Sequence, residues 1–377
     1  MKSDLSIEVL HAPQSLDAPD AGDFLEAAEL ANLVEELDQG NSDFRTSPQV
    51  RLVRAQPDGY QEQTVLLARS GRRIIGLAGI EVQLKDNLHL GNVVLQVHPD
   101  FRRRGVATAL YAAAVERLTA AGRNTIAGWS DHPAEPNSEE APGNGGILRP
   151  STGAGEVPLE AGAVAFSLGL GFGLEQVERM SVLSLPADAE RLQALAAGGG
   201  RADGYELISW GGHCPNEFAA GYAQLRQRMS TEVPLGGLDL REETWTVPRI
   251  RQDESKYART GGLLLVTAVR HAASGALVGH TVLEYHPEHP EVVFQDDTLV
   301  LPGHRGHRLG LRLKLRNLER LVADWPAAKR IYTFNAAENG HMLAINIGMG
   351  FVPAGCTGIW QKTFPARSTT DLTGPAS

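Results

Sequence analysis

The most informative stretch of this chain is residues 97–107, which read Val97-His98-Pro99-Asp100-Phe101-Arg102-Arg103-Arg104-Gly105-Val106-Ala107. The arrangement returns at residues 300–310, which read Val300-Leu301-Pro302-Gly303-His304-Arg305-Gly306-His307-Arg308-Leu309-Gly310. The proline, the first arginine and an upstream glycine (Gly76 and Gly279) all lie 203 positions from their counterparts. A repeat of this length is far longer than a solenoid unit, so it predicts a duplicated domain.

Each copy ends a strand-like run and opens a helix-like run, which is a favourable place to hold an anion. The first backbone N–H groups of a helix lack intrahelical partners, and the helix dipole favours negative charge there. Small residues at Gly105, Ala107, Gly306 and Gly310 would let a phosphate approach the backbone. The alternative is a solvated basic surface turn, which the recurrence in an equivalent context makes the weaker interpretation.

Composition limits the classes of protein to which the chain can belong. Its 377 residues predict two or three domains, and its net charge of −10 argues against general nucleic-acid binding while being compatible with an amine substrate. No apolar run reaches the roughly 18 residues of a membrane span, and the N-terminus lacks a signal-peptide core. Cys214 and Cys356 fit a reducing cytoplasm and give no metal-ligand spacing, with a disulfide between them as the minority alternative. We therefore expect a cytoplasmic protein with no metal, no nucleic-acid partner and no membrane partner.

Periodicity and turn residues predict the same mixed plan in both halves. We expect a first domain at 1–186, a linker at 187–203 with a break at Gly198-Gly199-Gly200, a second domain at 204–365, and a tail at 366–377. In the first domain the expected elements are a helix at 24–37, a hairpin at 63–82, a strand at 89–97, a helix at 105–121, a strand at 124–129, a long loop at 131–157 and a helix at 162–170. In the second they are helices at 215–229 and 242–256, a hairpin at 263–285, a strand at 292–301, a helix at 309–323, a strand at 330–334, a helix at 338–348 and a strand at 351–361.

A second shared signature supports the duplication. The pair Gly171-Phe172 begins 69 positions after Arg102, whereas Gly350-Phe351 begins 45 positions after Arg305. The difference of 24 is close to the length of the Pro- and Gly-rich loop at 131–157, so one insertion accounts for the mismatch.

The motif Arg102-x-x-Gly105-x-Ala107 resembles the Gln/Arg-x-x-Gly-x-Gly/Ala signature of the GNAT superfamily of acyl-CoA-dependent N-acetyltransferases. With the repeat, the whole chain resembles tandem GNAT proteins of actinobacterial type. The resemblance implies an α/β (α+β) fold of two tandem GNAT domains. Each would be a mixed, mostly antiparallel twisted sheet flanked by helices, with a V-shaped cleft between its fourth and fifth strands.

The resemblance also implies where acetyl-CoA would bind. Its pyrophosphate would lie on the loop that opens the helix, and its pantetheine arm would run along the fourth strand. The residues so implied are Leu95, Val97, Arg102, Arg103, Arg104, Gly105, Val106, Ala107 and Thr108 in the first half, and Thr298, Val300, Arg305, Gly306, His307, Arg308 and Gly310 in the second. The second copy departs from the pattern, because Arg308 stands where the family has glycine.

For catalysis the resemblance implies direct attack of an amine on the thioester, with a base that takes a proton and a backbone N–H that stabilises the oxyanion. Asp296 and Asp297 are the candidate bases, although either could cap a turn or face water, and His89 is a weaker candidate. Asn335 is a candidate hydrogen-bonding residue, whereas Asn339 is rather a helix N-cap.

The sequence therefore predicts an N-acetyltransferase that acts on a small-molecule amine, as a monomer or a homodimer. Many GNAT enzymes carry an acid tyrosine four residues before the Gly-Phe pair, but Ser167 and Asn346 occupy those positions here. This departure keeps an alternative open, namely an acyl-CoA-binding sensor or scaffold in which one or both halves are degenerate.

Overall fold

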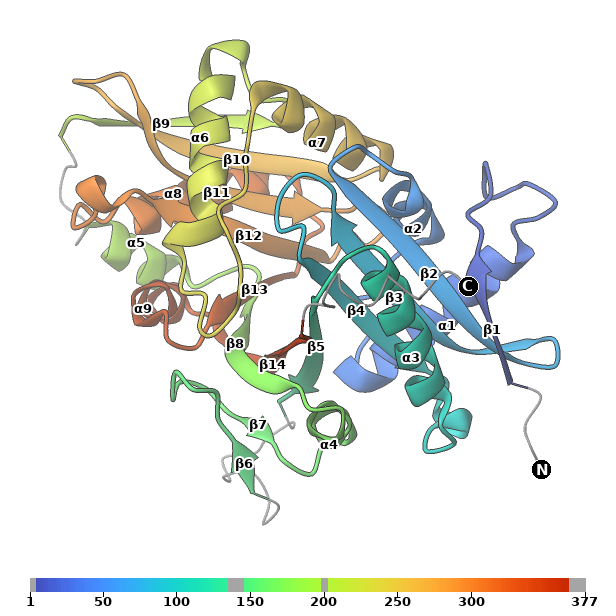
Figure 1. Cartoon of the computed structure of the whole chain (residues 1–377). Helices are drawn as coiled ribbons and strands as arrows, with labels where there is room; N and C mark the ends of the chain where they lie inside the picture. The colour runs from blue at the N-terminus through green and yellow to red at the C-terminus, as the bar shows by residue number, and fades with distance from the viewer. Residues whose placement is uncertain (1–4, 135–145, 198–202, 366–377) are drawn as a thin grey trace, which may run out of the picture.

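The computed structural model describes residues 5–134, 146–197 and 203–365. Within them, twelve strands form one sheet in the order β1-β2-β3-β4-β5-β14-β8-β13-β12-β11-β10-β9 (Figure 1). These strands are β1 (Leu5–Leu10), β2 (Gln61–Ser70), β3 (Arg73–Gln83), β4 (Leu90–Val97), β5 (Thr125–Pro133), β8 (Gly173–Ser184), β9 (Tyr205–Gly211), β10 (Leu263–His271), β11 (Leu277–Tyr285), β12 (Val292–Val300), β13 (Arg330–Ala336) and β14 (Val352–Thr363). The pairings are antiparallel except for β4 with β5 and β12 with β13, which are parallel.

Helices cover both faces of the sheet in each half, because the strands bury side chains on both sides. In the first half, α3 (Val106–Ala120) packs on one face through Leu110 and Ala114, and α1 (Gly22–Gln39) packs on the other through Leu30 and Val34. In the second half, α8 (Leu309–Asp324) and α6 (Asn216–Glu232) take the corresponding places. Each half is thus a helix–sheet–helix sandwich. The remaining helices are α2 (Pro48–Ala55), α4 (Gly162–Gly169), α5 (Ala189–Ala197), α7 (Val247–Arg259) and α9 (Gly340–Met349).

The two halves exchange their last strands. The C-terminal strand β14 lies between β5 and β8 of the first half, while β8 pairs on its other edge with β13 of the second half. Thr357 of β14 stands opposite Asp131 of β5 on one side and opposite Glu178 of β8 on the other. The sheet is therefore continuous across the repeat, whereas the sequence predicts a separate sheet in each domain.

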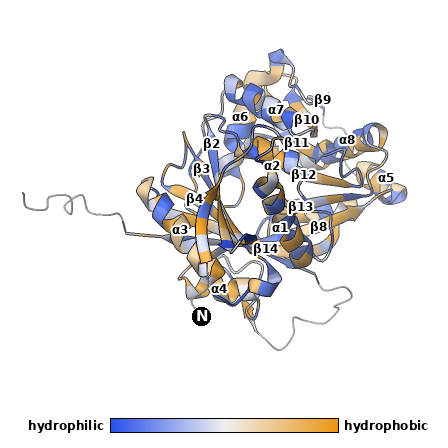
Figure 2. Ribbon diagram, turned by 90° about the vertical axis from the view of Figure 1, so that its right-hand side faces the viewer, coloured by the Kyte–Doolittle hydropathy of each residue, from blue (hydrophilic) through white to orange (hydrophobic). Residues whose placement is uncertain are grey.

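The segment after α1 also joins the halves. Arg330 of β13 donates to Asp43 through Nε at 2.7 Å and Nη2 at 2.9 Å, and the Tyr332 hydroxyl donates to the same carboxylate at 2.7 Å. The neighbouring Phe44 ring contacts Tyr332 and Phe294, with ring centroids 4.8 and 5.7 Å apart. In Figure 2, α1 and α2 accordingly lie between strands β2–β4 of the first half and β12 and β13 of the second.

Several expected boundaries are corrected by the structure. The helix expected at 242–256 begins at Val247, because the Thr246 side chain caps it by accepting from the Arg249 N–H at 3.4 Å. The expected loop at 131–157 contains regular structure: β5 extends to Pro133, and the short strands β6 (Ile147–Leu148) and β7 (Val157–Pro158) pair with each other. Residues 135–145 lie outside the described part of the chain.

The expected linker also begins as a packed helix. In α5, Arg191 donates through Nε to the Gly348 carbonyl at 2.7 Å and through Nη2 to the Ile347 carbonyl at 2.8 Å. The predicted break at Gly198-Gly199-Gly200 and the tail at 366–377 lie outside the described residues. Cys214 and Cys356 are both free thiols, so the disulfide alternative is not realised. None of the described helices has the length and apolar character needed to cross a membrane.

Candidate functional site

The parallel strands β4 and β5 pair over only three residues and then separate. The paired positions are 90–92 of β4 and 125–127 of β5, although β4 continues to Val97 and β5 to Pro133. A Cβ on Gly128 would lie 2.8 Å from the Val93 carbonyl oxygen, so the glycine permits the close approach at the point of separation. The parallel strands β12 and β13 separate in the same way after Gln295 and Thr333. Both halves therefore contain a V-shaped opening in the sheet.

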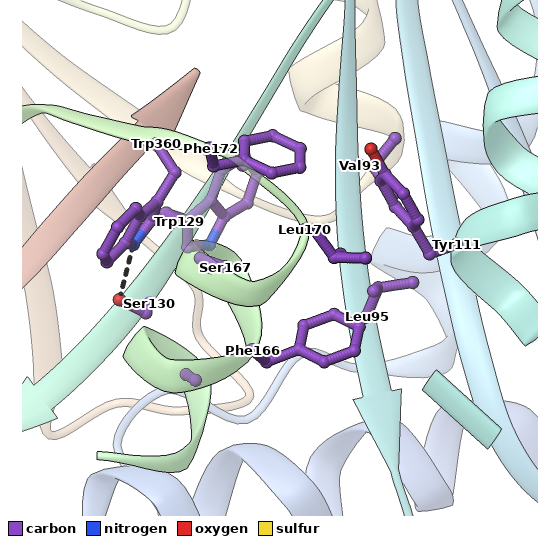
Figure 3. Close-up of a pocket in the computed structure, with 12 residues that line it drawn as sticks. Val93, Leu95, Tyr111, Trp129, Ser130, Phe166, Ser167, Leu170, Phe172 and Trp360 are labelled. Carbon is purple, nitrogen blue, oxygen red and sulfur yellow. Dashed lines mark hydrogen bonds between the residues drawn. The ribbon is translucent and has the colours of Figure 1, made fainter. Parts of the chain in front are cut away.

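The first opening contains a cavity of about 110 Å³ between β4, β5, α3 and α4. Figure 3 shows Leu95 and Val93 on one side and Phe166, Phe172 and Trp360 on the other. Its walls are mostly apolar, and no charged side chain belongs to the lining, which consists of Val93, Leu95, Tyr111, Gly128, Trp129, Ser130, Ala163, Phe166, Ser167, Leu170, Phe172 and Trp360.

The loop that joins β4 to α3 and the loop that joins β12 to α8 have the same backbone course. Each passes through a single 3-10 turn, Pro99–Phe101 or Pro302–His304, before its helix begins. Each also has two residues with positive φ: Arg103 (61°) and Gly105 (83°) in the first loop, Gly306 (85°) and Arg308 (55°) in the second. Glycine and arginine have therefore exchanged places. Arg308 adopts the left-handed conformation that glycine takes in the first copy, so the backbone course is preserved.

Known proteins share this architecture. Residues 30–138 match the family model described as the acetyltransferase (GNAT) family. A solved tandem GNAT protein from the clavulanic acid biosynthesis pathway, determined without AcCoA, is 26% identical, with 96% of this chain and 98% of that chain covered and a TM-score of 0.71. The first half of this chain therefore matches the GNAT family, and the chain as a whole is similar to a tandem GNAT protein.

More distant structures share the fold alone. A GCN5-related N-acetyltransferase from Sphaerobacter thermophilus is 14% identical over 96% of each chain, with a TM-score of 0.60. A glucosamine N-acetyltransferase region of a fungal multi-domain GH3 beta-N-acetylglucosaminidase is 13% identical, covering 96% of this chain and 38% of that chain, with a TM-score of 0.62. No curated protein matches the chain.

The first arginine of each loop, Arg102 or Arg305, hydrogen-bonds to the end of the preceding strand and to a carboxylate at the end of a helix. Arg102 donates through Nε to the Val97 carbonyl at 3.2 Å and through Nη2 to Asp38 at the end of α1, at 3.0 Å. Arg305 donates in the same way to the Val300 carbonyl at 3.0 Å and to Glu232 of α6 at 3.3 Å. This pairing fixes where each helix begins relative to its strand.

The other predicted loop residues divide into surface and packing positions. Arg103, Arg104, Gly105 and Thr108 are exposed at the start of α3, as are Gly306, His307 and Arg308 before α8. Val106 is buried, Ala107 is half-buried, and Gly310 is buried where α8 approaches Ile345 of α9. The described residues contain no group of three or more side chains able to hold a metal ion.

The predicted bases Asp296 and Asp297 lie where β12 leaves β13, but they differ in environment. The Nη1 atom of Arg226 lies 3.0 Å from an Asp297 carboxylate oxygen and 3.9 Å from Asp296. Burial opposes ionisation of Asp297, yet Arg226 and His280 outweigh it and lower its pKa. Burial together with repulsion from Asp297 and Glu284 raises the pKa of Asp296. Asp297 therefore serves as the counter-ion of Arg226, and Asp296 is the more basic of the two.

The remaining predicted residues of the second half have partners within the protein. The Asn346 amide donates to the Asn335 side-chain oxygen at 2.6 Å, and the Thr298 hydroxyl lies 2.8 Å from that of Thr281. Asn339 caps α9 by accepting from the Met342 N–H at 3.2 Å, which confirms the N-cap interpretation. His89, the weaker candidate, lies 3.2 Å from the Asp239 carboxylate and does not line the cavity.

Sequence reasoning missed an acidic group on the α1 face of the sheet. Burial and the charge of Asp131 raise the pKa of Glu35 in α1 to about 7, and the same two causes raise the pKa of Glu178 in β8 to about 7. The Thr357 hydroxyl of β14 donates to Asp131 at 2.6 Å. No local motif marks these residues, because they come from α1, β5, β8 and β14 and meet only through the strand exchange.

Proposed function

We propose that this chain transfers an acetyl group from acetyl-CoA to the amine of a small molecule, with the reaction in the first cleft. The observation that carries the proposal is the apolar cavity in the open part of β4 and β5, with the loop 102–107 at the far end of β4. The residues fit a ligand with a phosphorylated part and an apolar end, because the first N–H groups of α3 lie at this loop and the cavity lining is mostly apolar. Acetyl-CoA would supply the activated thioester.

The acceptor amine would approach from the α1 face. The Gln96 amide donates to the Ala31 carbonyl at 3.3 Å, so α1 crosses β4, and Glu35 follows one turn after Ala31. A carboxylate with a pKa of about 7 is well suited to take a proton from the attacking amine at neutral pH. Beyond Asn92, the edge of β4 that faces β5 has no ladder partner, so its backbone N–H groups are available to stabilise an oxyanion.

The second half supports the first in this proposal. On β12, which corresponds to β4, Arg226 neutralises the carboxylate of Asp297. The positions of β4 equivalent to Asp296 and Asp297 are Val93 and Val94. The observation favours a structural role for the second cleft. The alternative function is an acyl-CoA-binding sensor, which would follow if the first cleft binds acetyl-CoA without turnover.

The test is CoA release from acetyl-CoA against a panel of small amines across pH. We expect kcat/KM to rise with pH through about 7, because Glu35 is protonated below that pH and accepts no proton. Glu35→Gln should remove this limb and lower kcat by about 10²-fold or more. Glu36→Gln is the matched control, since Glu36 is the next residue and pairs with Arg45 on the surface. Equal rates for the two variants would contradict the assignment of the base, and acetyl-CoA binding without turnover of any amine would favour the sensor.

A further inference from the structure

Tyr111 places an unsatisfied hydroxyl in the first cleft. The side chain projects from α3 and is 9% exposed, and its hydroxyl makes no hydrogen bond within the part of the chain that the structure describes. The ring contacts Phe172 with centroids 5.9 Å apart, which fixes its direction. Because leaving a buried hydroxyl unpaired is costly, such a group in a cavity wall points to a ligand as its partner.

The other polar groups of the cavity are differently placed. The Ser130 hydroxyl accepts from the Trp360 indole N–H at 2.9 Å and lies 2.9 Å from His132, so it is satisfied. Ser167 lies on α4, at the position where many GNAT enzymes carry an acid tyrosine. Burial raises the pKa of Tyr111, so its hydroxyl stays protonated at neutral pH, as a proton donor must.

The hydroxyl lies at the narrow end of the V. Figure 3 shows the oxygen of Tyr111 beside Val93, the first β4 residue beyond the last pair with β5. The loop 102–107 lies at the other end of β4, and Val97 and Val93 are about 13 Å apart at the usual rise of a strand. A ligand anchored at the loop and extended along β4 would bring its far end to Tyr111.

The second half carries a polar side chain at the equivalent place. Lys314 of α8 lies 203 positions after Tyr111, is 2% exposed, and has its Nζ 5.9 Å from the centroid of Phe351, the counterpart of Phe172. Both copies thus place a hydrogen-bond donor at this helix position, and both lack a tyrosine at the position of Ser167 and Asn346.

We infer that the Tyr111 hydroxyl hydrogen-bonds the sulfur of acyl-CoA and protonates it when the thioester is cleaved. The inference rests on the proposed function. As the amine nitrogen bonds to the carbonyl carbon and the carbon–sulfur bond breaks, the sulfur keeps the electron pair and takes the Tyr111 proton. The amine proton leaves through the base to solvent, and Tyr111 regains a proton from solvent, so charge and atoms balance. Tyr111 would thereby replace the acid that is absent at position 167.

The test uses CoA itself and needs no acceptor. The thiol of CoA bound to the full chain is titrated by its thiolate absorbance in the wild type, Tyr111→Phe, Ser167→Ala and Tyr285→Phe, the last a matched control on a tyrosine buried in the second half. A hydrogen bond to the thiolate stabilises it, so the thiol pKa should be about one pH unit or more higher in Tyr111→Phe than in the wild type, and unchanged in Tyr285→Phe.

Three results would overturn the inference, and they can be told apart. Bound CoA with the same thiol pKa in the wild type and Tyr111→Phe would remove Tyr111 from the reaction and leave the proposed function standing. A rise in Ser167→Ala instead would assign the donor to Ser167. Failure of the wild type to bind CoA would refute the proposed function together with this inference.

Discussion

Gly105 and Arg308 occupy equivalent positions of the two loops and have the same left-handed backbone conformation, although the residue type differs. A non-glycine residue in the left-handed region costs roughly 1–2 kcal/mol. The first loop meets this cost at Arg103 and the second at Arg308, so each loop has one glycine and one strained arginine. The consequence is chemical, since the first loop has exposed arginines at 103 and 104 where the second has Gly306 and His307.

Lys314 gives a prediction about stability at the residue scale. Burial lowers its pKa to about 7, whereas an unfolded lysine titrates near 10.4. Between these two pH values folding therefore releases a proton. The destabilisation of the folded state is greatest below pH 7, and it declines as pH rises towards 10. Each pH unit between the two pKa values is worth about 1.4 kcal/mol.

Lys314→Met should consequently raise the melting temperature by several degrees at pH 7 and by clearly less at pH 9. Lys329→Met, on an exposed lysine that pairs with Glu291, is the control and should show no such change with pH. Thermal unfolding of the three proteins at both pH values decides the matter. If Lys314→Met did not raise the melting temperature at pH 7, or raised it equally at the two pH values, the burial of a charged Lys314 would not be destabilising.

At the scale of elements, the exchange of β8 and β14 determines which segments depend on each other. Residues 1–197 alone would leave the β14-facing edge of β5 unpaired, and β8 would lose both of its neighbours. Unpaired strand edges are sites of aggregation.

We therefore expect residues 1–197 expressed alone to aggregate, and the fragments 1–197 and 203–377 expressed together to purify as a one-to-one complex. Size-exclusion chromatography and circular dichroism of the single and combined fragments provide the measurement. Two fragments that are each folded and monomeric on their own would show that the strand exchange is dispensable.

Local patterns in the sequence were sufficient to predict the elements around each loop. The spacing from Val97 to Ala107 predicts a strand, a turn and a helix, and β4 and α3 confirm it. Strand partners were beyond such reasoning, because β8 and β14 both follow a Gly-Phe pair and their partners lie far away in the chain. The acidic group of Glu35, Asp131 and Glu178 was missed for the same reason, since it depends on that non-local pairing.

At the scale of the whole molecule, the two halves share one sheet and one backbone plan but differ in chemistry. The first cleft has an apolar cavity, a loop rich in arginine and an acidic group on the opposite face. The corresponding strand of the second half carries the Arg226–Asp297 ion pair. In the proposed function the first half therefore carries out catalysis, and the second half completes the sheet and supports it.

In the proposed function acetyl-CoA binds at the first loop, and calorimetric titration of acetyl-CoA into matched variants measures that binding. Arg104→Glu and His307→Glu place a carboxylate at equivalent exposed positions, neither of which has a positive φ. We predict one site per chain in the wild type, at least about tenfold weaker binding in Arg104→Glu because a negative charge at the helix start repels phosphate, and affinity within about twofold of the wild type in His307→Glu. Unchanged binding in Arg104→Glu together with loss in His307→Glu would place the acetyl-CoA site at the second loop instead.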